Sequence, residues 1–300
     1  VLVGGQGRRV GQVGFEVQLA QVQGTLEPLV GLGAALLQAL VAEAVEAEVE
    51  GAEVSVAVQA AGELLGDAVV DVLDGPDHNV APSGCLPIAW DETGGRTTGG
   101  HRRLLGSARW GLVPRWAKDP SFGARTFNAR AETVASKPAY RSAFRRRRCV
   151  VPVDGFYEWG PGPSVGGATT KPRKQPWYVQ RADGSPMVLA GLWEDWTDPD
   201  DEADTVLVLR TCTVVTVPAN ADMAPVHHRM PAVLDPDDWR AWLDPAADDP
   251  VGLEALLVPA PDGALRRHPV DRGVGDARRK GDGLIEPVDP GPADGQEALW

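Results

Sequence analysis

The chain of 300 residues has few cysteines and no long apolar run. Cys85, Cys149 and Cys212 are far apart and odd in number, so they fit a reducing compartment better than a disulfide framework or a zinc site. No stretch of about 18 apolar residues is free of charges and helix breakers, so no membrane span is indicated. Arg8 and Arg9 are not followed by a compact apolar run and a cleavage site, as a secretory signal would require. These absences predict a cytoplasmic protein.

Residues 1–75 differ in composition from the rest of the chain. They contain no Lys, Trp, Tyr or Cys, show few turn signals and lack clear helix caps. Our hypothesis is that this atypical segment is a frame or start-site artefact of a GC-rich gene; a genuine Ala- and Val-rich helical extension is the alternative. We therefore expect a folded domain over 76–287 and a polar tail over 288–300.

The formal net charge of -13 hides a basic middle third. Residues 101–181 carry seventeen Lys and Arg against four Asp and Glu, whereas residues 182–300 carry nine against twenty-four. An acidic protein with such a distribution can still present a positive groove to a polyanion. A solvated basic face is the other interpretation of the same pattern.

The patterning of residues 76–287 predicts an α+β fold, a β-rich single domain whose sheet is mainly antiparallel or barrel-like, with flanking helices. Beta-branched and aromatic residues over 151–159 predict a central buried strand with a kink at Asp154-Gly155. Ala182-Asp183-Gly184-Ser185 is a strong hairpin signal between two apolar runs. Residues 205–217 predict a long strand, and Pro236 opens a capped helix.

Glu158 stands near the end of the predicted central strand, between Tyr157 and Trp159. Aromatic walls on both sides favour the protonated form of a carboxylic acid, which suits proton transfer. A strand-end glutamate that points to solvent is the competing interpretation. The stretch alone does not decide between them.

Five motifs occur in one order along the chain and together resemble the SOS response-associated peptidase (SRAP) family. They are Asn79-Val80-Ala81-Pro82, Trp110-Gly111-Leu112-Val113-Pro114, Asn128-Ala129-Arg130-Ala131-Glu132-Thr133, Val151 to Trp159, and Val226-His227-His228-Arg229-Met230-Pro231. The resemblance covers residues 76–287. It implies a β-rich fold with a DNA groove that senses abasic sites in single-stranded DNA during the SOS and DNA-damage response.

The resemblance also implies roles for particular residues. Glu158 matches the family's acid/base residue, Asn128 the contact that orients the intermediate, and His227 a second proton-transfer group. Arg130 matches a phosphate clamp, while Trp116 and Trp159 match aromatics near the DNA. Arginine with interleaved tryptophan also suits single-strand binding on physical grounds, through backbone neutralisation and base stacking. For His227 the alternative is a satisfied core histidine.

The family's chemistry takes place at a cysteine directly after the initiator methionine. There the free α-amine and the thiol capture the aldehyde of the abasic site in a thiazolidine ring, after autoproteolytic removal of the preceding residue. No Met-Cys-Gly-Arg start is present in this sequence, and an internal cysteine such as Cys85 has no free α-amine. We expect either that a frame error has replaced the true start or that this copy lacks the nucleophile, which leaves enzymatic activity an open question.

Three classes of function are therefore weighed. The first is a DNA–protein crosslinking enzyme, and the second is a catalytically silent single-stranded DNA-binding protein of the same fold. The third, a metal hydrolase using His227, His228 and Glu158, is disfavoured because adjacent residues of an extended segment point to opposite faces. We expect abasic single-stranded DNA as the partner, with no cofactor, metal, membrane or obligate protein partner, and a cytoplasmic location with nucleoid association on DNA damage.

Overall fold

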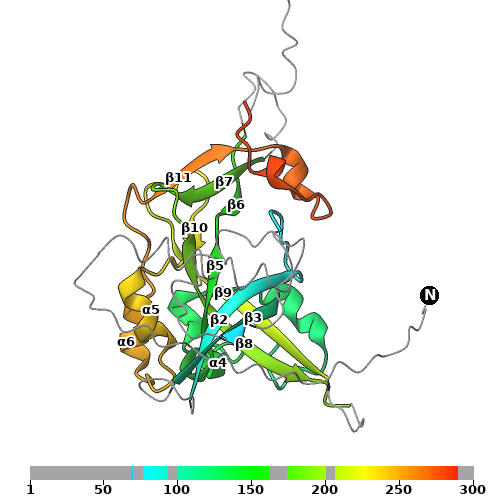
Figure 1. The fold of residues 1–300 in the computed structure, drawn as a ribbon, viewed down its shortest axis with the longest axis vertical. Helices are drawn as coiled ribbons and strands as arrows, with labels where there is room; N and C mark the ends of the chain where they lie inside the picture. Colours follow the sequence, from blue (N-terminus) through cyan, green and yellow to red (C-terminus); the bar gives the residue numbers. More distant parts are fainter. Residues whose placement is uncertain (1–68, 71–76, 94–100, 163–173, 201–206, 290–300) are drawn as a thin grey trace, which may run out of the picture.

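The computed structural model describes residues 69–70, 77–93, 101–162, 174–200 and 207–289 (Figure 1). Over these ranges the chain forms two β-sheets, with short helices around them. The described part of the chain is therefore an α+β fold rich in β-structure, as the sequence predicted. Nothing is described of residues 1–68, 71–76 or 290–300, which include most of the segment set apart by its composition and most of the expected polar tail.

The larger sheet closes on itself. Its strand order is β1-β3-β2-β5-β8-β9-β10, β4 pairs with β9, and β3 pairs with β9 as well as with β2. Strands β3, β2, β5, β8 and β9 therefore form a closed ring. The strands are β1 (Val69–Val70), β2 (Cys85–Thr93), β3 (His101–Trp110), β4 (Asn128–Arg130), β5 (Arg148–Val153), β8 (Met187–Thr197), β9 (Val208–Pro218) and β10 (Arg229–Pro231).

The smaller sheet is antiparallel and lies above the barrel in Figure 1. It consists of β6 (Phe156–Gly160), β7 (Gln175–Arg181) and β11 (Leu265–Pro269), with β7 in the middle. One of its faces packs on two short 3-10 helices, η2 (Arg272–Gly275) and η3 (Asp282–Leu284), in a core separate from that of the barrel. The buried members of this second core are Tyr178, Val270, Val274 and Leu284.

Helices cover the outside of the barrel. They are η1 (Pro120–Arg125), α3 (Ala131–Val134), α4 (Arg141–Arg146), α5 (Pro236–Leu243) and α6 (Pro250–Ala255). Arg148, which is 3% exposed, joins two of them to the sheet. Its guanidinium donates to the carbonyls of Phe144 and Arg145 at the end of α4, and to those of Trp242, Asp244 and Ala247 at and beyond the end of α5. Burial lowers the pKa of Arg148 to about 10, so it remains charged at neutral pH.

The predicted central strand is in fact two strands in two sheets. β5 belongs to the barrel and β6 to the smaller sheet, and the expected kink at Asp154-Gly155 is the crossing point between them. A Cβ atom on Gly155 would lie 2.4 Å from the ring of Tyr178. Glycine is therefore required there because the chain passes directly against a buried aromatic ring.

The predicted hairpin around Asp183-Gly184 was wrong. A turn is present, with Gly184 at a φ of 80° and its N–H bonded to the carbonyl of Arg181. The flanking strands, however, do not pair: β7 pairs with β6 and β11, and β8 pairs with β5 and β9. Local turn chemistry specified the reversal, while tertiary packing sent the two strands to different sheets.

The segment 1–75 contributes one described element. Val69 and Val70 form β1, which pairs in parallel with Leu104 and Leu105 at the edge of the larger sheet. β1 lies outside the closed ring of five strands. Whether the rest of the segment is foreign to the fold stays a hypothesis.

Candidate functional site

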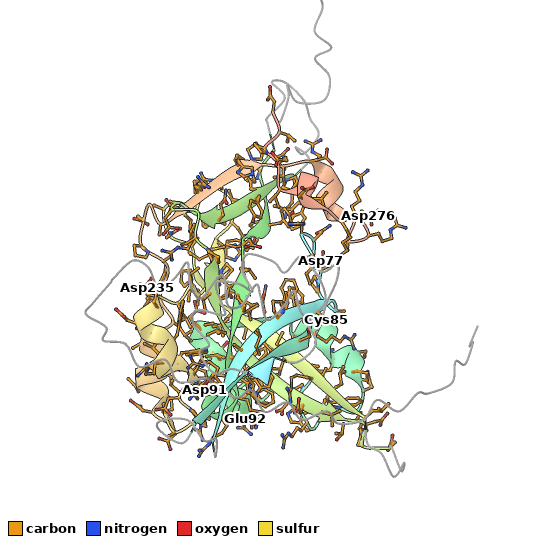
Figure 2. The ribbon with its side chains drawn as sticks, in the orientation of Figure 1. Asp77, Cys85, Asp91, Glu92, Asp235 and Asp276 are labelled. Atoms are coloured by element: carbon orange, nitrogen blue, oxygen red, sulfur yellow. The ribbon has the colours of Figure 1, made fainter. Side chains whose placement is uncertain are left out.

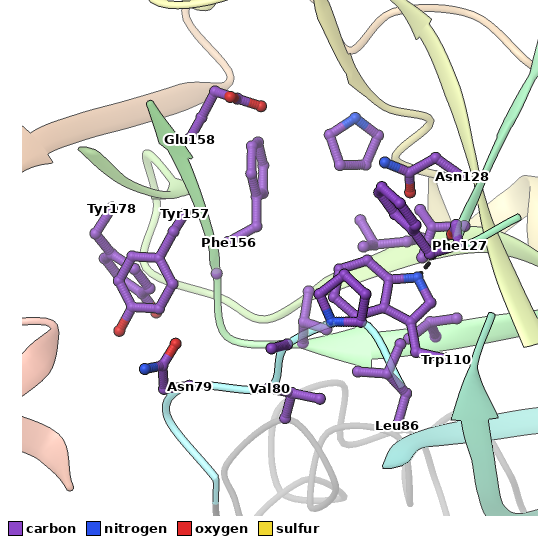
Figure 3. A pocket seen from close by; sticks show the side chains of 18 of the residues that line it. Asn79, Val80, Leu86, Trp110, Phe127, Asn128, Phe156, Tyr157, Glu158 and Tyr178 are labelled. Atoms are coloured by element: carbon purple, nitrogen blue, oxygen red, sulfur yellow. Dashed lines mark hydrogen bonds between the residues drawn. The ribbon is translucent and has the colours of Figure 1, made fainter. Parts of the chain in front are cut away.

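A cavity of about 760 Å³ lies between the barrel and the smaller sheet. Three walls converge on it: β6, the start of β4 with the loop before β10, and the loop before β2. Its apolar floor comes from β5, β8 and β9, through Val151, Val153, Leu189 and Val214. The crossing from β5 to β6 therefore creates both a wall and the floor of the same cavity (Figure 3).

Glu158 and His227 face each other in this cavity. The Oε2 atom of Glu158 lies 3.6 Å from Nδ1 of His227, and the two side chains are 26% and 33% exposed. The other carboxylate oxygen accepts the backbone N–H of Trp159 at 2.9 Å. Nδ1 of His227 lies 3.2 Å from the backbone nitrogen of Arg229 and 3.1 Å from its carbonyl oxygen, so it accepts from the first or donates to the second according to the tautomer of the ring. Because 3.6 Å exceeds a hydrogen bond, a substrate atom between the two groups can contact both.

Asn128 stands on the wall opposite Glu158 (Figure 3). It opens β4, where its side chain is exposed to the cavity and its carbonyl accepts the hydroxyl of Tyr140 at 3.1 Å. Next to it, the Trp110 indole N–H donates to the carbonyl of Phe127 at 2.7 Å. Trp110 is thus fixed in orientation and lines the cavity as well as packing against the core.

The aromatic walls expected around Glu158 are arranged differently. Side chains alternate along β6, so Tyr157 and Trp159 lie on the opposite face and pack against the second core. The aromatic residue that shares the face of Glu158 is Phe156, as Figure 3 shows. Burial, with a smaller contribution from the charge of Asp77, raises the pKa of Tyr157 to about 12, so this phenol stays protonated.

Two arginines line the cavity near Asn128 and His227. Arg130, at the end of β4, is exposed. Arg229 is more enclosed: its guanidinium pairs with both carboxylate oxygens of Glu132 and donates to the carbonyl and hydroxyl of Thr216. Hydrogen bonding from Arg229 holds the pKa of Glu132 below its usual value. The guanidinium of Arg130 is therefore accessible to a ligand, whereas that of Arg229 is held in one orientation by Glu132 and Thr216.

The third wall is held by Asn79. Its buried side-chain amide donates to the carbonyls of Val274, Asp276 and Arg279, at 3.1, 3.1 and 3.2 Å. The ammonium of Lys280 reinforces this link by donating to the carbonyl of Asn79 at 2.9 Å. Asp77 and Asp276 accordingly lie close together above Cys85 in Figure 2. The Asn-Val-Ala-Pro motif thus ties the cavity wall to the C-terminal segment.

The cavity brings together five of the six residues singled out from the sequence. Glu158, Asn128, His227 and Arg130 line it, and Trp159 borders it from the opposite face of β6. Trp116 does not: it is 59% exposed and packs edge-to-face on Phe122, with the ring centroids 5.1 Å apart. A contact between Trp116 and DNA stays a prediction, and it concerns a surface outside the cavity.

The three cysteines differ in exposure. Cys85, at the start of β2, is exposed and lines the cavity, whereas Cys149 and Cys212 are fully buried. Burial raises the pKa of both buried thiols, so they remain protonated and unreactive at neutral pH.

Sequence reasoning did not single out Arg229, Phe156 and Thr216. Arg229 belongs to the same motif as His227, and Phe156 is two residues before Glu158, the spacing that places two strand residues on one face. Thr216 carries a hydroxyl in the apolar second half of β9, and a buried hydroxyl usually has a hydrogen-bond partner. Each signal was present in the sequence.

Within the described ranges, no group of three or more His, Cys, Asp and Glu side chains is arranged to hold a metal ion. In the same part of the chain, no helix has the length and apolarity to span a membrane.

Comparison with known proteins finds a matching family model, relatives in sequence and solved structures of similar fold. The family model for the SOS response associated peptidase (SRAP) matches residues 44–277, a range that begins inside the compositionally atypical segment. The Abasic site processing protein YoqW of Bacillus subtilis is 35% identical over 213 residues, which cover 70% of this chain and 86% of YoqW. YoaM, an Abasic site processing protein of the same organism, is 37% identical over 185 residues, covering 61% and 73% of the two chains. A crystal structure of a protein from Bacteroides thetaiotaomicron covers 84% of this chain and 96% of its own, with a TM-score of 0.55; at 20% identity it supports the fold.

Proposed function

Because the chain belongs to the SOS response-associated peptidase family, we propose that it processes abasic sites in single-stranded DNA at the cavity between its two sheets. The observation that carries the proposal is the convergence of Glu158, His227 and Asn128, which come from three separate segments, on one cavity. An abasic site has no base, so its sugar can enter a space that a stacked nucleotide could not.

The proposed reaction is capture of the ring-opened aldehyde by an α-amino thiol of the family type. The amine adds to the aldehyde carbon, and a proton donor converts the resulting hydroxyl into water as the imine forms. The thiol then adds to the imine carbon, its proton passing to the nitrogen, and a thiazolidine ring results. Removal of the residue before the cysteine, by autoproteolysis, first frees the amine.

The cavity residues divide these proton transfers between them. Glu158 in its acid form protonates the departing hydroxyl, and the carboxylate that remains can accept a proton again. His227 lies 3.6 Å away and supplies the second proton-transfer group near neutral pH. The side-chain amide of Asn128, on the opposite wall, orients the sugar by hydrogen bonding.

Arg130 is proposed to hold a phosphate of the strand at the mouth of the cavity. Its exposed guanidinium lies on the same strand as Asn128, two residues away, so both side chains reach the same space. Trp159 is proposed to provide apolar surface nearby, and Trp116 a contact farther along the strand.

The alternative function is that of a silent single-stranded DNA-binding protein with the same fold. The three cysteines of the chain all stand inside the sequence, where a peptide bond occupies the nitrogen that a thiazolidine requires. A chain without an N-terminal cysteine keeps the binding cavity but cannot complete the ring. The two functions differ in covalent adduct formation and share the preference for abasic strands.

The test compares the affinity of the chain for three oligonucleotides: a single strand with one abasic site, the same strand intact, and a duplex. Fluorescence anisotropy should show the tightest binding to the abasic strand, and Asn128→Ala should remove that preference. A denaturing gel run in parallel separates the crosslinking enzyme from the silent binder. Equal affinity of the unmodified chain for abasic and intact strands would contradict the proposal.

A further inference from the structure

Three cations lie on one side of α4 and the turn before it. Lys137, Arg141 and Arg145 are all exposed, and no ion pair joins any of them to an acidic side chain within the described part of the chain. They follow one another at four-residue intervals, and the N–H of Arg141 bonds to the carbonyl of Lys137 at 2.9 Å, as in a helical turn. We call these three residues the α4 stripe.

The stripe is not explained by the stability of the helix. Like charges four residues apart on a helix repel one another. Cations are favoured at a helix C-terminus, but Arg141 is the first residue of α4 and Lys137 precedes it, where the helix dipole disfavours positive charge. The C-terminal carbonyls of α4 are instead capped by Arg148. The opposite side of α4 is fixed in the core by Ala143 and Phe144.

The stripe is linked to the cavity wall through Tyr140. Tyr140, in the turn between Lys137 and Arg141, donates its hydroxyl to the carbonyl of Asn128 at 3.1 Å. Arg130 follows two residues later in β4 and is the exposed cation of the cavity wall. The stripe therefore begins next to the turn that supports the strand carrying Asn128 and Arg130.

We propose that the α4 stripe binds the phosphate backbone of the DNA strand where it leaves the cavity, an inference that rests on the proposed function. Lys137 and Arg145 are eight residues apart in sequence, about 12 Å at the helical rise per residue, so the three cations can each contact a different phosphate of one strand. Three regularly spaced cations in a protein of net charge -13 are suited to a polyanion. The stripe thereby sets the length of strand that the protein covers, beyond the nucleotide that reacts.

The test uses the full chain and single strands of about 6 and about 16 nucleotides, each with one reduced abasic site. In the stripe variant, Lys137, Arg141 and Arg145 are all changed to Gln. In the control variant, three exposed arginines on other elements, Arg240, Arg266 and Arg278, are changed to Gln, so that the net charge changes equally. Circular dichroism and thermal unfolding check that both variants fold.

Raising the salt from 50 to 200 mM should weaken binding of the 16-nucleotide strand to both proteins. If the stripe makes three phosphate contacts, the loss of affinity should be about 20-fold larger for the unmodified chain than for the stripe variant. The control variant should keep the salt dependence of the unmodified chain, and all three proteins should bind the 6-nucleotide strand alike. An equal salt dependence in the stripe and control variants would contradict phosphate binding by the stripe, and it would leave the proposed function of the cavity untouched. Failure of the unmodified chain to bind either strand would overturn both.

Discussion

Glu158 and Asn79 both line the cavity, yet their side chains serve different purposes. The carboxylate of Glu158 is partly exposed and faces an imidazole, so it can meet a substrate. The amide of Asn79 is buried, and its donors are used by three backbone carbonyls, so it holds a wall in place. Exposure and unused hydrogen-bonding capacity therefore distinguish a residue that can react with a substrate, such as Glu158, from one that holds the site in shape, such as Asn79. Both residues belong to motifs of the family.

Cysteine reactivity should follow the same division. In the folded protein at pH 8, iodoacetamide should modify Cys85 alone, because Cys149 and Cys212 are buried and burial raises the pKa of both thiols. Peptide mass spectrometry should find the other two modified only after denaturation. Modification of Cys149 or Cys212 in the native protein at the rate of Cys85 would contradict the burial described for the two strands.

Arg130 should contribute one phosphate contact. Arg130→Ala should weaken single-strand binding and make the slope of log affinity against log salt shallower by about 0.7. Arg278→Ala is the matched control, because Arg278 is 91% exposed and already paired with Asp276. A slope that is the same in both variants as in the unmodified chain would exclude a phosphate role for Arg130.

Elements that lie within one run of residues were predictable, whereas their partners were not. The long strand β9 and the helix α5 stand where periodicity and the helix start signal placed them. The division of residues 151–159 between two sheets depends on the contact of Gly155 with Tyr178, more than twenty residues later, and no local pattern encodes that contact. For the same reason the turn at Gly184 was visible from sequence, but the separation of β7 from β8 was not.

The crossing from β5 to β6 should be intolerant of a side chain. Gly155→Ala should lower the free energy of unfolding by about 1–3 kcal/mol, because its Cβ would overlap the ring of Tyr178 in a packed core. Gly283→Ala serves as the control, since a Cβ there meets nothing within 4 Å. Urea denaturation followed by tryptophan fluorescence measures both. Equal stability of the two variants would mean that the crossing is not closely packed.

Arg148 should be needed to hold α4 and α5 on the barrel. Arg148→Met leaves buried carbonyls of both helices without a donor, so unfolding should require about 3 kcal/mol less free energy. Arg146→Met removes an exposed neighbouring charge and should change the stability by less than about 0.5 kcal/mol. A stable Arg148→Met protein would show that the helices are held by apolar packing alone.

For the molecule as a whole, charge distribution matters more than net charge. The chain is acidic, but Arg130 and the α4 stripe place exposed cations on and beside the cavity. The charge asymmetry was visible in the sequence, and five of the six residues singled out from the sequence line or border the cavity. The sixth, Trp116, follows the Trp-Gly-Leu-Val-Pro motif closely, but the turn after it carries its ring to another surface.

The most direct test of the account is covalent capture of an abasic strand, followed on a denaturing gel after heating. Cys85, Cys149 and Cys212 each lack a free α-amine, so none of these three residues should form the heat-stable thiazolidine adduct. A variant with Met-Cys-Gly-Arg in place of residues 1–75 should form the adduct, and Glu158→Gln in that background should slow its formation. Failure of the Met-Cys-Gly-Arg variant to form a heat-stable adduct would contradict the account, as would an adduct that forms equally fast with Gln at position 158.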